Sequence, residues 1–200
     1  MKTTLKTLAF SALISLLGIS PFIFMEIVNR REFNEDFPFR LFFALWLNLF
    51  AILLILLPLG LGIWRMKRSQ DQPAPQGESL SPTNPRSTAI LSLGIFLVPL
   101  ILQGLDALGW LPLGQLLNGP DPEEFYLPGW VINLVLFSFP LAAGMIASRQ
   151  IVRTLRVGGK LFAHPIHWII VISLSTLFAI GLVNLIIDQW PCFIGVPNCD

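Results

Sequence analysis

Two histidines, His164 and His167, stand three residues apart in the stretch AHPIHW, and the chain has no others. Imidazole side chains can act as general acid and base near neutral pH, or they can bind a metal ion. A zinc site would need further ligands, and Pro165 disturbs the helical spacing of the two rings. We therefore expect no metal site here. The histidines are predicted to cap a helix and contact lipid headgroups, with use in an enzyme as the alternative.

The same stretch is similar, over these few residues, to the histidine–proline motif of membrane-bound isoprenylcysteine-type methyltransferases. That resemblance implies a membrane-embedded enzyme that modifies lipids or isoprenoids, with His164, His167 and the basic residues of 149–156 at headgroup level. The acidic and arginine residues that follow the motif in that family have no counterparts downstream of it here. The activity is therefore not carried over to this chain.

The two cysteines, Cys192 and Cys199, fall in the terminal stretch WPCFIGVPNCD. Their spacing is not that of a C-x-x-C redox motif, and no histidine accompanies them as a metal ligand. We predict a structural disulfide, because Pro191 and Pro197 stiffen the segment and Gly195 allows it to turn. Closing so short a loop contributes at most about 2.5 kcal/mol.

Polar side chains inside apolar segments are the remaining candidates, since they are expensive in hydrocarbon. They are Glu26, Asn48, Gln103, Asp106, Asn133 and Asn184. A permease would line its path with such groups. Helices that pack together without transporting anything would use the same residues for hydrogen bonds between them. We expect the second role. The sequence contains none of the common nucleotide, zinc-protease or hydrolase motifs, so no cofactor is expected.

Five apolar runs must position these residues, and each has the length of about 20 residues that a helix needs to cross a bilayer. They are residues 8–28, 41–64, 88–110, 129–148 and 168–187. The chain is 54% hydrophobic and 12% charged, with a mean hydropathy of +0.71, whereas soluble domains carry about 25% charged residues. We predict an all-α polytopic integral membrane protein with five transmembrane helices, the first of them retained rather than cleaved as a signal.

Basic residues predict the orientation, because cytoplasmic segments carry most of the lysine and arginine. Ten of the thirteen lie in alternate connecting segments: Lys2, Lys6, Arg65, Lys67, Arg68, Arg86, Arg149, Arg153, Arg156 and Lys160. The N-terminus is therefore expected in the cytoplasm and the C-terminus outside, in a bacterial-type inner membrane or a thylakoid. A net charge of +1 gives no indication of a nucleic-acid partner.

We expect three parts in the chain. A two-span unit covers 1–64, a flexible Pro/Ser-rich cytoplasmic linker covers 65–88, and a three-span unit covers 89–200. The last unit includes a short amphipathic cytoplasmic helix, 149–157, and an external disulfide tail, 190–200. The cations Arg149, Arg153, Arg156 and Lys160 are expected to contact anionic headgroups, or else a phosphorylated ligand or acidic partner.

Small residues on the fourth span predict close helix packing, either within the chain or toward another subunit. They are Ala143, Gly144, Ala147 and Ser148. The function we expect is that of a non-catalytic accessory, assembly or scaffolding subunit, with the lipid bilayer and other membrane proteins or further copies of itself as partners. A small permease or channel component is the first alternative, and a lipid- or isoprenoid-modifying enzyme is the second.

Overall fold

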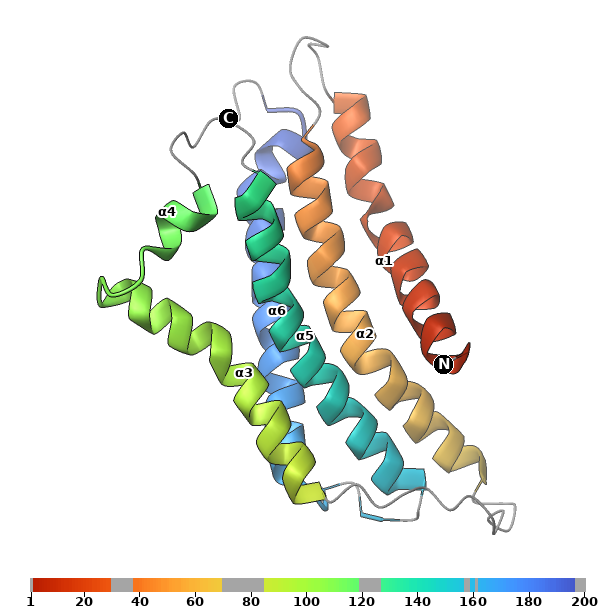
Figure 1. Ribbon diagram of the computed structural model, residues 1–200. Helices are drawn as coiled ribbons and strands as arrows, with labels where there is room; N and C mark the ends of the chain where they lie inside the picture. Colours follow the sequence, from red (N-terminus) through yellow and green to blue (C-terminus); the bar gives the residue numbers. More distant parts are fainter. Residues whose placement is uncertain are drawn as a thin grey trace. The chain divides into compact units, whose positions relative to one another are not determined.

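The computed structural model describes residues 2–29, 38–69, 85–118, 127–156, 159–160 and 162–196. The helices in this part of the chain are α1 (Lys2–Asn29), α2 (Phe39–Ser69), α3 (Pro85–Ala107), α4 (Leu113–Asn118), α5 (Leu127–Arg156) and α6 (Pro165–Phe193) (Figure 1). Among the described residues, five helices, all but α4, are long and apolar enough to span a bilayer. An all-helical fold with five helices of spanning length is thus confirmed.

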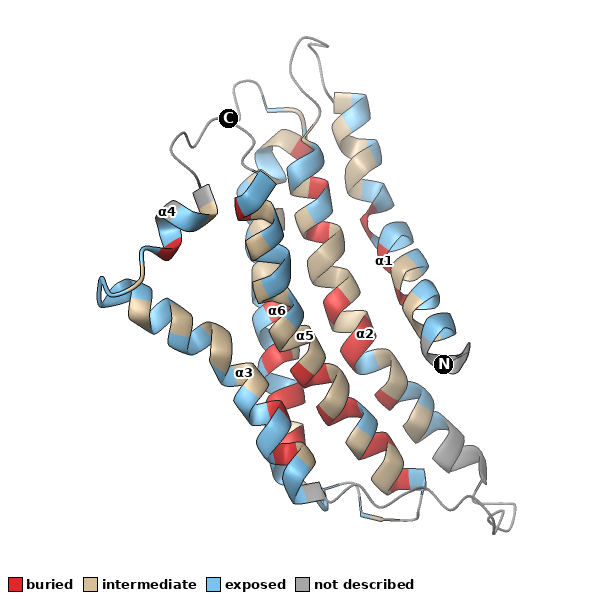
Figure 2. Cartoon of the chain, viewed as in Figure 1, coloured by how far each residue is buried: buried red, intermediate tan, exposed pale blue. Residues whose placement is uncertain are grey.

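Large apolar side chains face outward on every long helix. Leu17 of α1, Ile90 of α3 and Leu177 of α6 are 62%, 72% and 58% exposed, and Figure 2 shows exposed positions along all of these helices. In water, so much exposed apolar surface would drive association. In a bilayer the lipid tails cover it, so the exposed faces fit a membrane protein.

The chain divides into two compact units. The terminal unit comprises Met1–Leu61 and Ile172–Asp200, and the central unit comprises Gly62–Val171. This division differs from the expected one, because most of α6 belongs with α1 and α2 rather than with α3 and α5. The contacts of Phe193, near the end of α6, supply the physical reason.

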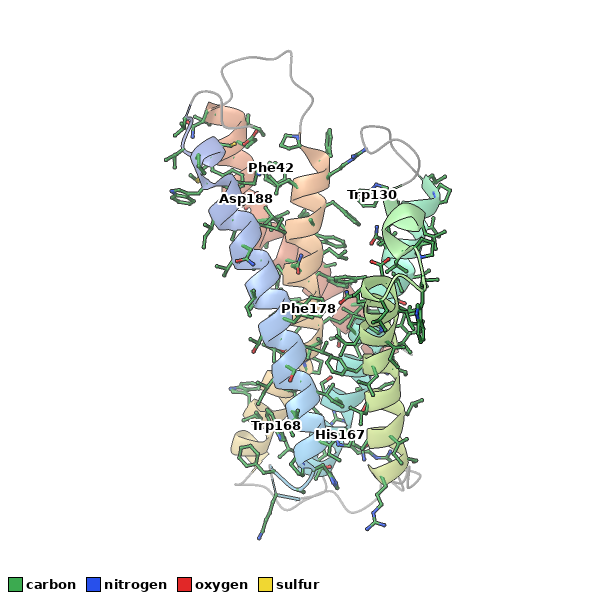
Figure 3. All side chains as sticks on the ribbon, turned by 90° about the vertical axis from the view of Figure 1, so that its left-hand side faces the viewer. Phe42, Trp130, His167, Trp168, Phe178 and Asp188 are labelled. Carbon is green, nitrogen blue, oxygen red and sulfur yellow. The ribbon has the colours of Figure 1, made fainter. Side chains whose placement is uncertain are left out.

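Phe193 lies at the centre of the terminal unit's aromatic core. Its side chain is 0% exposed, and its ring centroid lies 5.3 Å from that of Phe22 in α1 and 6.2 Å from that of Phe42 in α2. Ile19 and Leu45 complete this buried cluster, and Figure 3 labels Phe42 in it. The end of α6 is thereby packed against both α1 and α2.

Asn29, the last residue of α1, adds a polar contact at the same place. Its Nδ2 donates a hydrogen bond to the backbone oxygen of Phe193. The last four carbonyl groups of any helix lack partners within that helix, so this bond satisfies one of them. The cap connects the ends of α1 and α6.

The proline inside α1 leaves a carbonyl without its usual partner, because Pro21 has no N–H to donate to Leu17 four residues earlier. The hydroxyl of Ser20 donates to that carbonyl oxygen instead, at 2.8 Å. Hydroxyl groups that supply such bonds are one reason why membrane helices tolerate proline.

A hydrogen bond also joins α2 to α1: Trp46 Nε1 of α2 donates to the backbone oxygen of Ala12 at 3.3 Å.

Helix α5 packs against α3 and α4 in the central unit. The small-residue face is buried within the chain: Ala143 and Ala147 are 0% exposed, Ser148 is 1% exposed, and Gly144 is also buried. The same stripe of α5 continues through Val152, whose methyl groups lie beside Gly62 of α2. The burial of these residues fits packing within the chain, and contact with another subunit stays a prediction.

Helices α3 and α6 end in the same way. Gly109 has φ +71°, its N–H donates to the oxygen of Asp106, and the N–H of Trp110 donates to that of Leu105. Gly195 has φ +77°, its N–H donates to the oxygen of Cys192, and the next N–H donates to that of Pro191. This pair of bonds defines the Schellman motif, in which glycine reverses the chain after a helix. The turn predicted at Gly195 is confirmed.

Two element boundaries differ from those expected. Helix α5 continues unbroken through 149–156 instead of giving way to a separate short helix, since neither proline nor glycine interrupts it after Gly144. Helix α6 runs through Cys192 to Phe193, so the expected tail loop begins as helix. Of the expected linker 65–88, residues 65–69 belong to α2 and 85–88 to α3, and 70–84 lie outside the described residues.

Candidate functional site

Asp106, predicted as a carboxylate within a span, holds the turn between α3 and α4. Its Oδ1 accepts hydrogen bonds from the backbone N–H groups of Leu113 at 2.7 Å and of Gly114 at 3.4 Å. These are the first residues of α4, whose N–H groups have no carbonyl partners within the helix. The carboxylate therefore caps α4 from the preceding helix, a role that does not require transport.

We predict that Asp106→Ala lowers the free energy of unfolding by about 1 kcal/mol, the usual value of an N-terminal cap. Asp106→Asn should be close to neutral, because the amide oxygen accepts the same bonds. Unfolding of the purified variants in mixed micelles of increasing SDS content measures both changes. A large loss in Asp106→Asn would mean that the negative charge itself stabilises the start of α4.

The other polar residues of the spans do not form a common site. Asn48 Nδ2 donates to the backbone oxygen of Ala44 in its own helix at 2.9 Å, and its Oδ1 faces Gly181 of α6. The side chains of Gln103, Asn133 and Asn184 are exposed, and Glu26 is half-buried. Among the described residues, no hydrogen bond joins any two of the six predicted polar positions.

The two histidines are brought together at the start of α6. Their ring centroids lie 5.8 Å apart in an edge-on arrangement. His164 precedes the helix and is half-buried, whereas His167 is 1% exposed and lies on the side of α6 that adjoins α3 (Figure 3). The exposed capping role expected for both histidines therefore fits His164 but not His167.

His167 forms one contact across the helix pair and leaves one nitrogen without a partner. Its Nε2 lies 3.5 Å from Thr88 Oγ1 of α3, at the long limit of a hydrogen bond. Its Nδ1 is buried and has no hydrogen-bonding partner. Leaving a buried polar group unsatisfied costs about 1–3 kcal/mol, so such a nitrogen needs an explanation.

A cavity of about 370 Å³ lies beside these rings, and the first turns of α3 and α6 both line it. Arg86, Ala89 and Leu93 come from α3, and His164, Pro165 and His167 come from the start of α6. Sequence reasoning did not connect Arg86 or Thr88 with the histidines. No local signal could have done so, because 79 positions separate Thr88 from His167. Among the described residues, no cluster of three or more metal-ligating side chains occurs.

The predicted arginine face lies on the last two turns of α5. Arg149 and Arg156 are exposed and Arg153 is half-buried, while Ile151 and Leu155 on the other side are buried. The amphipathic division expected for this stretch is therefore present, although the helix is continuous with the span. Lys160, after the helix end, is also exposed.

A second concavity lies in the terminal unit, where residues of α2 and α6 line a groove of about 490 Å³. Its walls include Ile52 and Leu56 of α2 and the polar side chains Ser175, Thr176 and Asn184 of α6. The hydroxyl of Ser175 is buried without a hydrogen-bonding partner. Most other described serines within helices instead donate to a carbonyl three residues earlier, as Ser148 does to Met145.

The cysteine pair is only partly described. Cys192 lies in the last turn of α6, directly before buried Phe193, and Cys199 lies outside the described residues. The bridge between them stays a prediction.

Comparisons with protein-family models, with curated proteins and with solved structures found no match to this chain.

Proposed function

We propose that the chain is a non-catalytic accessory subunit that binds another membrane protein through the α2–α6 groove. The observation that carries the proposal is the exposed amide of Asn184 in a groove whose walls are mostly aliphatic. An amide in hydrocarbon gains from a hydrogen bond to a neighbouring helix, and hydroxyls such as those of Ser175 and Thr176 supply further donors. A helix of a partner protein would satisfy these groups.

The remaining polar groups support a role without chemistry. Asp106 caps α4, Asn29 caps the end of α6, and Asn48 bonds within its own helix. The small-residue face, which was the first candidate for partner binding, is buried within the chain. The groove is therefore the better candidate for an interface.

Photocrosslinking tests this interface. A benzophenone amino acid at Thr176, in the groove, should yield one adduct with another membrane protein in native membranes. The same group at Val131, exposed on α5 outside the groove, serves as the control. Adducts with lipid alone, or only with further copies of this chain, would contradict the proposal.

We predict that Asn184→Leu weakens the complex about fivefold, because one hydrogen bond between membrane helices contributes roughly 1 kcal/mol. Asn133→Leu removes an exposed asparagine from α5 and should leave the affinity unchanged. Quantitative recovery of the partner after purification in a gentle detergent measures both variants. Equal loss in the two would mean that a general change in hydrophobicity is responsible.

We also propose that the N-terminus is cytoplasmic and that the C-terminus lies outside, in a bacterial-type inner membrane or a thylakoid. The positions of the basic residues support this orientation, and so does the need of a disulfide for an oxidising compartment.

Because Cys192 and Cys199 are the only cysteines, a thiol-reactive polymer should shift the protein on a gel only after reduction. An impermeant reductant applied from outside should suffice. A shift without reduction would contradict the bridge.

A further inference from the structure

The cavity at the start of α3 and α6, within the central unit, has an uneven distribution of polarity. Arg86, His164 and His167 supply its polar groups, while Ala89, Ile90 and Leu93 form an apolar wall along α3. No acidic side chain is part of its lining. The cavity surface is therefore mostly apolar, and its cationic end consists of the residues at the starts of α3 and α6.

The backbone reinforces the positive end. α3 begins at Pro85 and α6 at Pro165, and residues from both first turns line the same cavity. The N–H groups of a first helical turn have no carbonyl partners within the helix, and the helix dipole places partial positive charge there. Helix N-termini of this kind bind phosphate and other anions.

His167 gives an independent indication of a ligand. It is 1% exposed and lines the cavity, its Nε2 faces Thr88, and its Nδ1 has no partner. If Nε2 accepts a hydrogen bond from Thr88, then Nδ1 carries a proton and needs an acceptor. A ligand oxygen beside the ring would provide that acceptor.

The cationic end and the apolar wall together narrow the class of ligand. A free anion would use the cationic end but would leave the wall of Ile90 and Leu93 unused. An uncharged lipid would use the wall but not the arginine, the imidazoles or the helix N-termini. An anionic phospholipid uses both, because its phosphate and its acyl chain are joined in one molecule.

We propose that this cavity binds an anionic membrane phospholipid. Its phosphate lies between Arg86 and His167 at the two helix N-termini, and its acyl chain follows Ile90 and Leu93. The site is separate from the α2–α6 groove, so it does not depend on the proposed partner. It does depend on the five long helices being embedded in a bilayer, because a bilayer would place the starts of α3 and α6 at the level of the lipid headgroups.

The test uses the full-length protein in detergent micelles with dioleoyl phosphatidic acid as the probe. Native mass spectrometry counts bound lipid, and dioleoyl phosphatidylcholine and inorganic phosphate are the comparison ligands. We expect phosphatidic acid to bind preferentially and inorganic phosphate at millimolar concentration not to displace it. Equal binding of the two lipids would overturn the proposal. Displacement by free phosphate would overturn the choice of a lipid as the ligand.

Variants locate the site. Arg86→Gln should weaken binding about tenfold, since a hydrogen bond to a charged group is worth about that factor. His167→Leu should weaken binding to a similar degree if Nδ1 donates to the phosphate. Arg156→Gln removes an exposed cation of α5 that does not line the cavity, so it should change affinity less than twofold.

Equal loss in Arg156→Gln and Arg86→Gln would overturn the proposal in favour of general attraction between charges. Unchanged affinity in His167→Leu would overturn the placement of the phosphate beside His167. If that variant does not fold, Arg86→Gln still decides the question, because Arg86 is exposed on the first turn of α3.

Discussion

Replacing Phe193 with alanine is expected to lower the free energy of unfolding by about 3 kcal/mol, at the lower end of the range for buried phenylalanine. The side chain is fully buried, and its ring contacts those of Phe22 and Phe42. Its loss would leave a cavity between three helices that the neighbouring side chains cannot fill. In a membrane the transfer of the ring from water contributes less, so lost packing contacts account for most of the effect.

The measurement is SDS-induced unfolding in mixed micelles, followed by tryptophan fluorescence. Phe24→Ala is the matched control, because Phe24 of α1 lies in the same terminal unit but is 67% exposed. It should change the free energy of unfolding by less than about 0.5 kcal/mol. Comparable losses in the two variants would contradict the view that Phe193 is the central packing residue of this unit.

Gly62→Ile is expected to have the second largest effect, a loss of about 2 kcal/mol. A Cβ atom at Gly62 would lie 3.1 Å and 3.2 Å from the two methyl carbons of Val152 on α5. An isoleucine there adds further atoms on a branched side chain that has few rotamers available in a helix. The end of α2 would have to move away from α5 within the central unit.

Gly60→Ile provides the control, because a Cβ at Gly60 meets no atom within 4 Å. Both substitutions replace a helical glycine by the same residue, so their effects on helix propensity cancel in the comparison. The same micelle titration applies. If the Gly60 variant loses as much stability as the Gly62 variant, close approach of α2 to Val152 is not what the glycine provides.

The number and approximate bounds of the long helices could be predicted, because length and hydropathy are properties of a single segment. The pairing of helices could not. Residues such as Leu17, Ile90 and Leu177 are exposed on helices that are apolar all round, so no amphipathic pattern marks the inner face. Serine and other small residues gave the best indication of which helix face is buried, and Ala147 and Ser148 are indeed buried.

The candidate site was harder to predict for a related reason. The histidines were visible as residue types, but burial of His167 depends on α3, a helix far away in the sequence. Asp106 looked like a functional carboxylate because its actual role, accepting a hydrogen bond from the backbone N–H of Leu113, leaves no sequence pattern. The continuation of α5 through 149–156 could have been foreseen, since the change in polarity there is not accompanied by a helix-breaking residue.

The packing of Phe193 against α1 and α2 has a consequence for biogenesis. Residues 62–171 form a unit that is contiguous in the sequence, whereas the terminal unit needs residues from both ends of the chain. At about 5–20 residues per second, roughly 8–30 s of translation separate the emergence of Phe42 from that of Phe193. During that interval the first two helices wait in the membrane with an incomplete aromatic cluster. Chaperones and membrane proteases could therefore recognise an unfinished or truncated chain by the exposed surface around Phe22 and Phe42.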